Sequence, residues 1–104
     1  MTEKRPCKVV STYLGFEDHG LVLVQVDVDF GTSRQSFQAS YSPHVRHNEA
    51  KNLFDAITGI FRAFNVDRWE KLPGRSAFAL IEDDHIAGFE GFLFDGGAVY
   101  KRNV

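Results

Sequence analysis

The sequence predicts an α+β fold in which a largely antiparallel sheet carries one main amphipathic helix on one face. Residues 22–30 alternate apolar and polar side chains with a period of two, which is typical of a half-buried strand. Residues 50–64 repeat their apolar side chains at helical spacing instead. Two more strand-like segments follow this helix, so the order β-β-β-α-β-β is segregated rather than alternating. At 104 residues, we expect one domain over residues 1–104.

The first strand is expected over residues 7–16, and the turn at residues 17–20 joins it to the second strand. With this loop length, three cross-strand pairs follow: Tyr13 with Val24, Val9 with Val28, and Lys8 with Asp29.

Gly31 and Thr32 are expected to close the next hairpin, because a glycine in first place supplies the positive φ that such a turn needs. Every pair then matches apolar with apolar or polar with polar, and a slip of one residue would destroy this match. The predicted pairs are Asp29 with Arg34, Val26 with Phe37, Val24 with Ala39, and Val22 with Tyr41.

The helix is expected to begin at Pro43 behind a Ser42 cap, with Asn48 as the alternative cap. Its apolar stripe consists of Ala50, Leu53, Phe54, Ile57, Ile60, Phe61 and Phe64. A neighbouring stripe is small enough for close approach by another element, and it consists of Ala56, Gly59 and Ala63. Asn65 can take the left-handed position after the helix, with Val66 as its hydrophobic partner.

A one-turn helix through Leu72 is expected next, with Asp67 as its cap, and Pro73 and Gly74 end it. Residues 75–81 and 86–94 then form a second hairpin, with Phe78 opposite Phe89 and Ile81 opposite Ile86.

The last of these strands is apolar on both faces, through Phe89, Phe92, Leu93 and Phe94. Such a strand is either covered on both sides, which we favour, or it exposes a patch that requires a partner. Homodimerisation would be the simplest way to cover it. Gly88 and Gly91 are expected to relieve crowding by the phenylalanines.

Charge and cysteine content narrow the function classes. Twelve Lys and Arg against fourteen Asp and Glu give a net charge of −2, which argues against both a polyanion binder and an acidic DNA mimic.

Cys7 is the only cysteine, so we expect the protein to work in a reducing compartment. Cys7 is better interpreted as a small buried hydrophobic residue than as a nucleophile. With no signal-peptide core and no run of transmembrane length, we expect a soluble cytoplasmic protein with no membrane partner.

The two hairpin tips are alike in composition, residues 17–20 reading EDHG and residues 82–85 reading EDDH. At one end of the sheet, their carboxylates and imidazoles could hold a divalent ion or perform acid/base chemistry. The alternative, which we favour, is that turns select these residues for their backbone angles. Trp69 is expected to cover the core or to act as a binding hot spot. The candidate binding residues are Glu17, Asp18, His19, Trp69, Asp84 and His85.

No catalytic residue, metal ligand or cofactor is assigned, since no nucleophile elbow, P-loop or dinucleotide motif occurs. His44 and His47 could share a helical face but have no carboxylate close by in the sequence. A nucleic-acid partner is not expected, because the outward positions of the second and third strands are mixed polar rather than basic and aromatic.

Three segments carry a resemblance: residues 12–20 (TYLGFEDHG), 35–37 (QSF) and 66–74 (VDRWEKLPG). In this order and spacing, they resemble a family of small uncharacterised proteins of tailed bacteriophages and prophages, over about residues 9–94. Related sequences carry a Gly-rich segment where this chain reads QASY at residues 38–41, and a charged segment around a Trp where it has residues 92–100.

The resemblance implies a phage accessory protein acting in the cytoplasm of a bacterial host. Our leading expectation is a non-enzymatic, anti-CRISPR-like protein that binds and occludes a host defence component. The alternatives are a protein that binds or sequesters a small ligand or a metal through the hairpin tips, and a nucleic-acid accessory factor.

Overall fold

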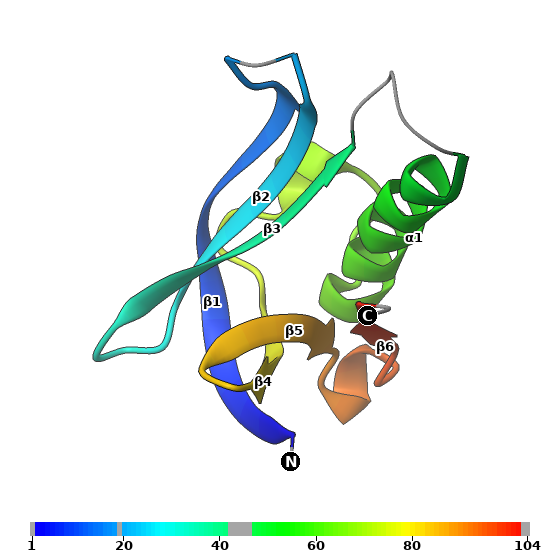
Figure 1. The fold of residues 1–104 in the computed structure, drawn as a ribbon. Helices are drawn as coiled ribbons and strands as arrows, with labels where there is room; N and C mark the ends of the chain where they lie inside the picture. The colour runs from blue at the N-terminus through cyan, green and yellow to red at the C-terminus, as the bar shows by residue number, and fades with distance from the viewer. Residues whose placement is uncertain (1, 19, 42–46, 103–104) are drawn as a thin grey trace.

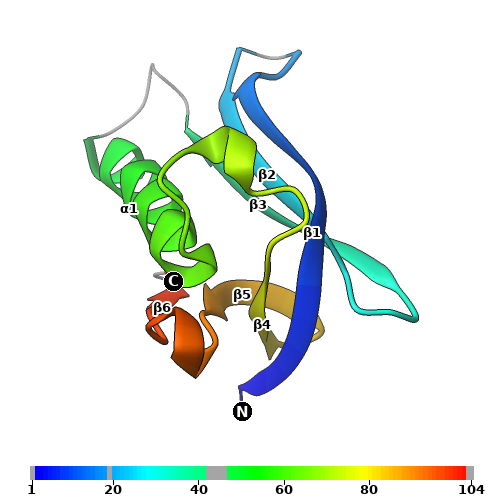
Figure 2. The same ribbon diagram turned by 180° about the vertical axis from the view of Figure 1, so that it is seen from behind.

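The computed structural model describes residues 2–18, 20–41 and 47–102. It contains a six-stranded sheet of order β3-β2-β1-β4-β5-β6, in which each strand is antiparallel to its neighbours, and one α-helix packs on this sheet (Figures 1 and 2). The predicted α+β class is therefore confirmed. The elements are β1 (Glu3–Phe16), β2 (Val22–Asp29), β3 (Arg34–Tyr41), α1 (His47–Phe64), the 3-10 helix η1 (Trp69–Lys71), β4 (Ser76–Glu82), β5 (His85–Glu90), the 3-10 helix η2 (Leu93–Asp95) and β6 (Val99–Lys101).

β1 begins at Glu3, earlier than predicted, and two different strands pair with its two halves. Glu3–Lys8 pairs with β4, whereas the part from Lys8 to Phe16 pairs with β2. The sheet curves strongly. Three strands separate β3 from β5 in the sheet, yet the ring centroids of Phe37 on β3 and Phe89 on β5 are only 5.5 Å apart. The helix α1 lies across the open side of this curve (Figure 1).

The β2–β3 register is as predicted at all four pairs, and Gly31 has a φ of 96°. The predicted β1–β2 register is correct at two of its three pairs. Lys8 faces Asp29 and Val9 faces Val28 as expected, but a bulge follows between Val9 and Ser11. The extra residue places Leu14, not Tyr13, opposite Val24, so the prediction for Tyr13 was wrong.

α1 begins at His47, and the predicted cap at Ser42 and Pro43 lies outside the described residues. Its buried side chains are Ala56, Ile60, Ala63 and Phe64. Phe54 is 66% exposed, so its place in the buried stripe was wrong. The buried face is turned toward the small stripe because the C-terminal strand crosses the helix there. A Cβ on Gly59 would lie 2.5 Å from the Tyr100 ring.

The helix ends as predicted. Asn65 has a φ of 54°, its N–H donates to Arg62 O (3.2 Å), and the Val66 N–H donates to Phe61 O (3.0 Å). The following one-turn helix is η1, but Asp67 does not cap it. The Asp67 carboxylate instead pairs with Arg68 and Lys71 at 3.3 and 3.2 Å.

The second hairpin differs from expectation at two places. Ile81 faces Ile86 as predicted, but an irregularity between Leu80 and Ile81 places Phe89 opposite Ala79, and Phe78 faces Glu90. β5 also ends at Glu90 rather than Phe94.

Backbone crowding, not the phenylalanine side chains, explains the two glycines. A Cβ at Gly91 would lie 2.6 Å from Ala63 O, and one at Gly88 would collide with Tyr100 O. β5 therefore ends one residue before a close approach to the end of α1.

The core lies between the concave face of the sheet and α1. Its largest fully buried side chains are Phe37, Phe64, Phe89, Ile60, Leu72, Val9, Val24, Val26 and Val28. Burying each Phe, Ile, Leu or Val stabilises the fold by roughly 1.5–3 kcal/mol, so this layer is the main source of stability.

Candidate functional site

The two hairpin tips lie at opposite ends of β1. The first tip follows Phe16, at the C-terminal end of this strand, whereas the second follows the β4 end that pairs with Glu3. A 14-residue strand separates them, in a molecule whose longest dimension is 39 Å. The tips therefore do not form a common site, and the described residues contain no group of three His, Cys, Asp or Glu that could hold a metal ion.

The first tip is organised by Glu17. Its backbone pairs with Leu21 O (2.8 Å), and its carboxylate accepts the Leu21 N–H (3.2 Å). Gly20 has a φ of 79°, and Asp18 is exposed. His19 lies outside the described residues.

The second tip is a two-residue turn in which Asp83 and Asp84 have φ values of 51° and 65°. Asp and Asn tolerate such angles, which accounts for the acidic composition of this turn. Asp84 O accepts a hydrogen bond from Gln35 Nε2 at 2.6 Å, and the His85 side chain is exposed. Hydrogen bonds from Lys101 and Thr2 hold the pKa of the Glu82 carboxyl below its usual range.

Trp69 partly covers the core. It packs against the buried cluster, with its ring centroid 6.3 Å from that of Phe61. This is the lid position expected from the sequence, and a role of Trp69 in binding stays a prediction.

The most exposed large apolar side chains lie on η2. Leu93 is 94% exposed and Phe94 is 84% exposed. The Phe94 ring lies 5.4 Å from that of Phe92, which in turn lies 4.8 Å from Phe78 on β4. We call these four residues, Phe78, Phe92, Leu93 and Phe94, the η2 surface.

The η2 surface is held in place by its surroundings. The N–H groups of Asp95 and Gly97 donate to Phe92 O at 2.9 and 3.0 Å. The Asp95 carboxylate contacts Asn65 Nδ2 at 3.4 Å and Arg75 Nη2 at 3.9 Å. The turn is thus tied to the segment after α1, and the two exposed side chains project from a fixed support.

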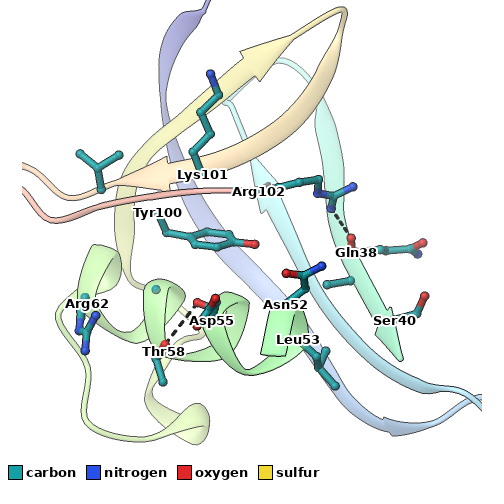
Figure 3. A pocket seen from close by; sticks show the side chains of 13 residues that line it. Gln38, Ser40, Asn52, Leu53, Asp55, Thr58, Arg62, Tyr100, Lys101 and Arg102 are labelled. Atoms are coloured by element: carbon teal, nitrogen blue, oxygen red, sulfur yellow. Dashed lines mark hydrogen bonds between the residues drawn. The ribbon is translucent and has the colours of Figure 1, made fainter. Parts of the chain in front are cut away.

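A second feature is a groove of about 490 Å³ between the two edge strands of the sheet, with α1 along one side (Figure 3). Polar groups form much of its lining. Arg102 donates to Gln38 O across the groove, and its guanidinium lies 4.6 Å from the centroid of the Phe37 ring. The residues that line the groove are Gln38, Ala39, Ser40, Asn52, Leu53, Asp55, Thr58, Gly59, Arg62, Val99, Tyr100, Lys101 and Arg102.

The convex face of β1–β3 carries a polar network centred on Asp27. Ser11 Oγ and Gln25 Nε2 donate to its carboxylate at 2.6 and 2.8 Å, and Ser36 Oγ donates as well. Although partial desolvation acts in the opposite direction, these hydrogen bonds lower the pKa of Asp27. Cys7 is buried in the core, as predicted, and this burial raises the pKa of its thiol to about 12.

Sequence reasoning identified the apolar character of residues 92–94 but placed them in a strand. It missed the groove entirely, because no sequence signal shows that residues 38–40 and 99–102 border the same space.

Among the helices of the described ranges, none is both long enough and apolar enough to cross a membrane. Comparisons with protein families, with curated proteins and with solved structures find no match to this chain.

Proposed function

We propose that this protein is a phage-encoded, non-enzymatic binding protein that inhibits a bacterial defence component by occluding it, in an anti-CRISPR-like manner, in the host cytoplasm. The resemblance described above supplies the phage context. The observation that carries the proposal is the η2 surface, where two neighbouring large apolar side chains stand 94% and 84% exposed on an anchored turn.

An exposed phenylalanine on a fixed support suits a protein partner. Burying its ring in a partner's pocket removes apolar area from water at roughly 25 cal/mol per Å². Because the hydrogen bonds of Asp95 and Gly97 already fix the turn, little conformational entropy is lost on binding. Anchors of this kind dominate protein interfaces, and truncating one costs about 2 kcal/mol or more, or roughly 30-fold in affinity.

The test is a phage challenge in host strains that each carry one defined defence system, with wild-type protein or a variant supplied. Phe94→Asp introduces a charge into the η2 surface, and Phe54→Asp is the matched control because Phe54 is also an exposed phenylalanine, on α1. We expect the wild-type protein and Phe54→Asp to restore infection in one strain, and Phe94→Asp to fail there. A protein that protects the phage in none of the strains, or a Phe94→Asp variant as active as wild type, would refute the proposal.

A further inference from the structure

The groove between β3 and β6 presents unpaired strand edges, since these strands are the two ends of the sheet. On β3, Phe30 N–H donates to Ser33 O at the turn, so residues 35, 37, 39 and 41 direct their backbone groups toward β2 by alternation. Gln38 and Ser40 therefore direct theirs outward. The bond from Arg102 to Gln38 O agrees with this assignment.

β6 presents an edge in the same way. Ala98 O accepts the Gly91 N–H and Arg102 N–H donates to Ala87 O, both at 2.8 Å, so these residues face β5. By alternation, Val99 and Lys101 direct their backbone groups away from β5. Within the described residues, the backbone N–H groups of Gln38, Ser40 and Lys101 donate no hydrogen bond.

The charges around the groove favour an acidic occupant. Arg62 and Arg102 line it, against the one carboxylate of Asp55, which pairs with Lys51 at 2.9 Å. Lys101 also borders the groove, but its side chain points away from it (Figure 3). Lys101 pairs with Glu82, but neither Arg62 nor Arg102 has a carboxylate partner among the described residues. Figure 3 shows Arg62 on α1 at one end of the groove and Arg102 beside Gln38 at the other.

We infer that the groove binds an extended acidic peptide segment of a partner protein, which adds as a strand at β3 by accepting hydrogen bonds from the outward N–H groups of Gln38 and Ser40. Small-molecule sites are concave and mostly apolar and enclose most of the ligand, whereas this groove is open and largely polar. Main-chain hydrogen bonds to an edge strand supply affinity in strand addition, and side-chain charges select the sequence. The site is distinct from the η2 surface and does not depend on the function proposed above.

The probe is an acetylated and amidated hexapeptide of alternating threonine and glutamate residues, titrated into the isotopically labelled full chain and followed by the backbone amide signals in NMR. We expect the signals of Gln38 and Ser40 to shift. The same peptide with lysine in place of glutamate should leave them unchanged. So should the glutamate peptide N-methylated at every residue, which blocks pairing with β3 along either edge of the peptide.

Two substitutions at one position separate backbone from side-chain recognition. Ser40→Pro removes the outward N–H, and a proline is tolerated at such a position of an edge strand. Ser40→Ala keeps the N–H and removes only the hydroxyl. We expect Ser40→Pro to weaken binding of the acidic peptide by roughly two- to tenfold, as for the loss of one hydrogen bond, and Ser40→Ala to bind as wild type.

Several results would overturn the inference. One is the absence of any shift with the acidic peptide, and another is equal binding of the lysine or N-methylated peptides to the wild-type protein. If free glutamate bound to the protein with the same affinity as the acidic peptide, the groove would be a site for a small anion. Sedimentation could also show that the chain self-associates and that Ser40→Pro abolishes this self-association. The β3 edge would then bind a second copy of the chain.

Discussion

Replacing Gly59 with alanine tests how closely β6 lies against α1. In an exposed helix this change stabilises by about 1 kcal/mol, because alanine is the better helix former. Here the new Cβ would lie 2.5 Å from three atoms of Tyr100, its Cβ, Cγ and Cδ1. Overpacking of this kind costs roughly 1–3 kcal/mol. We therefore expect Gly59→Ala to lower the free energy of unfolding by up to about 2 kcal/mol.

The same substitution should destabilise less once Tyr100 is shortened. Tyr100→Ala alone removes a half-buried ring that also contacts Phe37, at a cost of about 2 kcal/mol, or half that of a fully buried aromatic. In that background the alanine at position 59 no longer meets Cγ and Cδ1 of the ring but still lies against the Cβ of residue 100, so only part of the overpacking cost should remain. The coupling between the two sites is then about 0.5–2 kcal/mol.

Urea unfolding of the four proteins in this cycle measures these values, with the fluorescence of Trp69, the only tryptophan, as the probe. A Gly59→Ala change that stabilises both backgrounds equally would show that β6 does not lie against the helix at this point.

Two further predictions concern the convex face and the core. Asp27→Asn should lower the free energy of unfolding by about 1 kcal/mol at neutral pH, since the carboxylate accepts three side-chain hydrogen bonds on a partly exposed surface. Because the pKa of Asp27 is lowered in the fold, this stabilisation is present above the ordinary Asp pKa and is lost as the pH falls through the folded-state value. Urea unfolding should therefore show the two proteins converging below about pH 4, and a constant difference would contradict the assignment. The Cys7 thiol, with a pKa of about 12, should react with an aromatic disulfide reagent at mildly alkaline pH only as fast as the protein unfolds, and reaction of the native protein as fast as in denaturant would contradict its burial.

Local patterns in the sequence were sufficient where neighbouring segments pair through a short turn. The β2–β3 register was predictable because the turn geometry of Gly31 and the matching of side chains fix the same alignment. The end of α1 at Asn65 was predictable for a similar reason, since the Schellman motif depends only on nearby residues.

Bulges and strand ends were not predictable in this way. The bulge after Val9 lies near the point where β1 changes partner from β4 to β2, so long-range pairing decides it. β5 ends at Glu90, and the next residue, Gly91, lies close to Ala63 O at the end of α1. The chain then forms η2, in which Leu93 and Phe94 are exposed, whereas strand periodicity predicts a covered position for them.

The candidate sites show the same division. Acidic turn residues were identified from sequence, but only the two-sided pairing of β1 shows that the two tips lie at opposite ends of one strand. The groove exists because the sheet curves until its edge strands approach each other beside α1.

The sequence by itself determined the fold class, the β2–β3 pairing, the end of the helix and the small-residue stripe that receives Tyr100. Only the tertiary structure decided which apolar residues remain exposed and which polar residues share a groove. The physical reason is that alternation and helical spacing act over a few residues, whereas exposure depends on elements far apart in the chain that compete for the same surface.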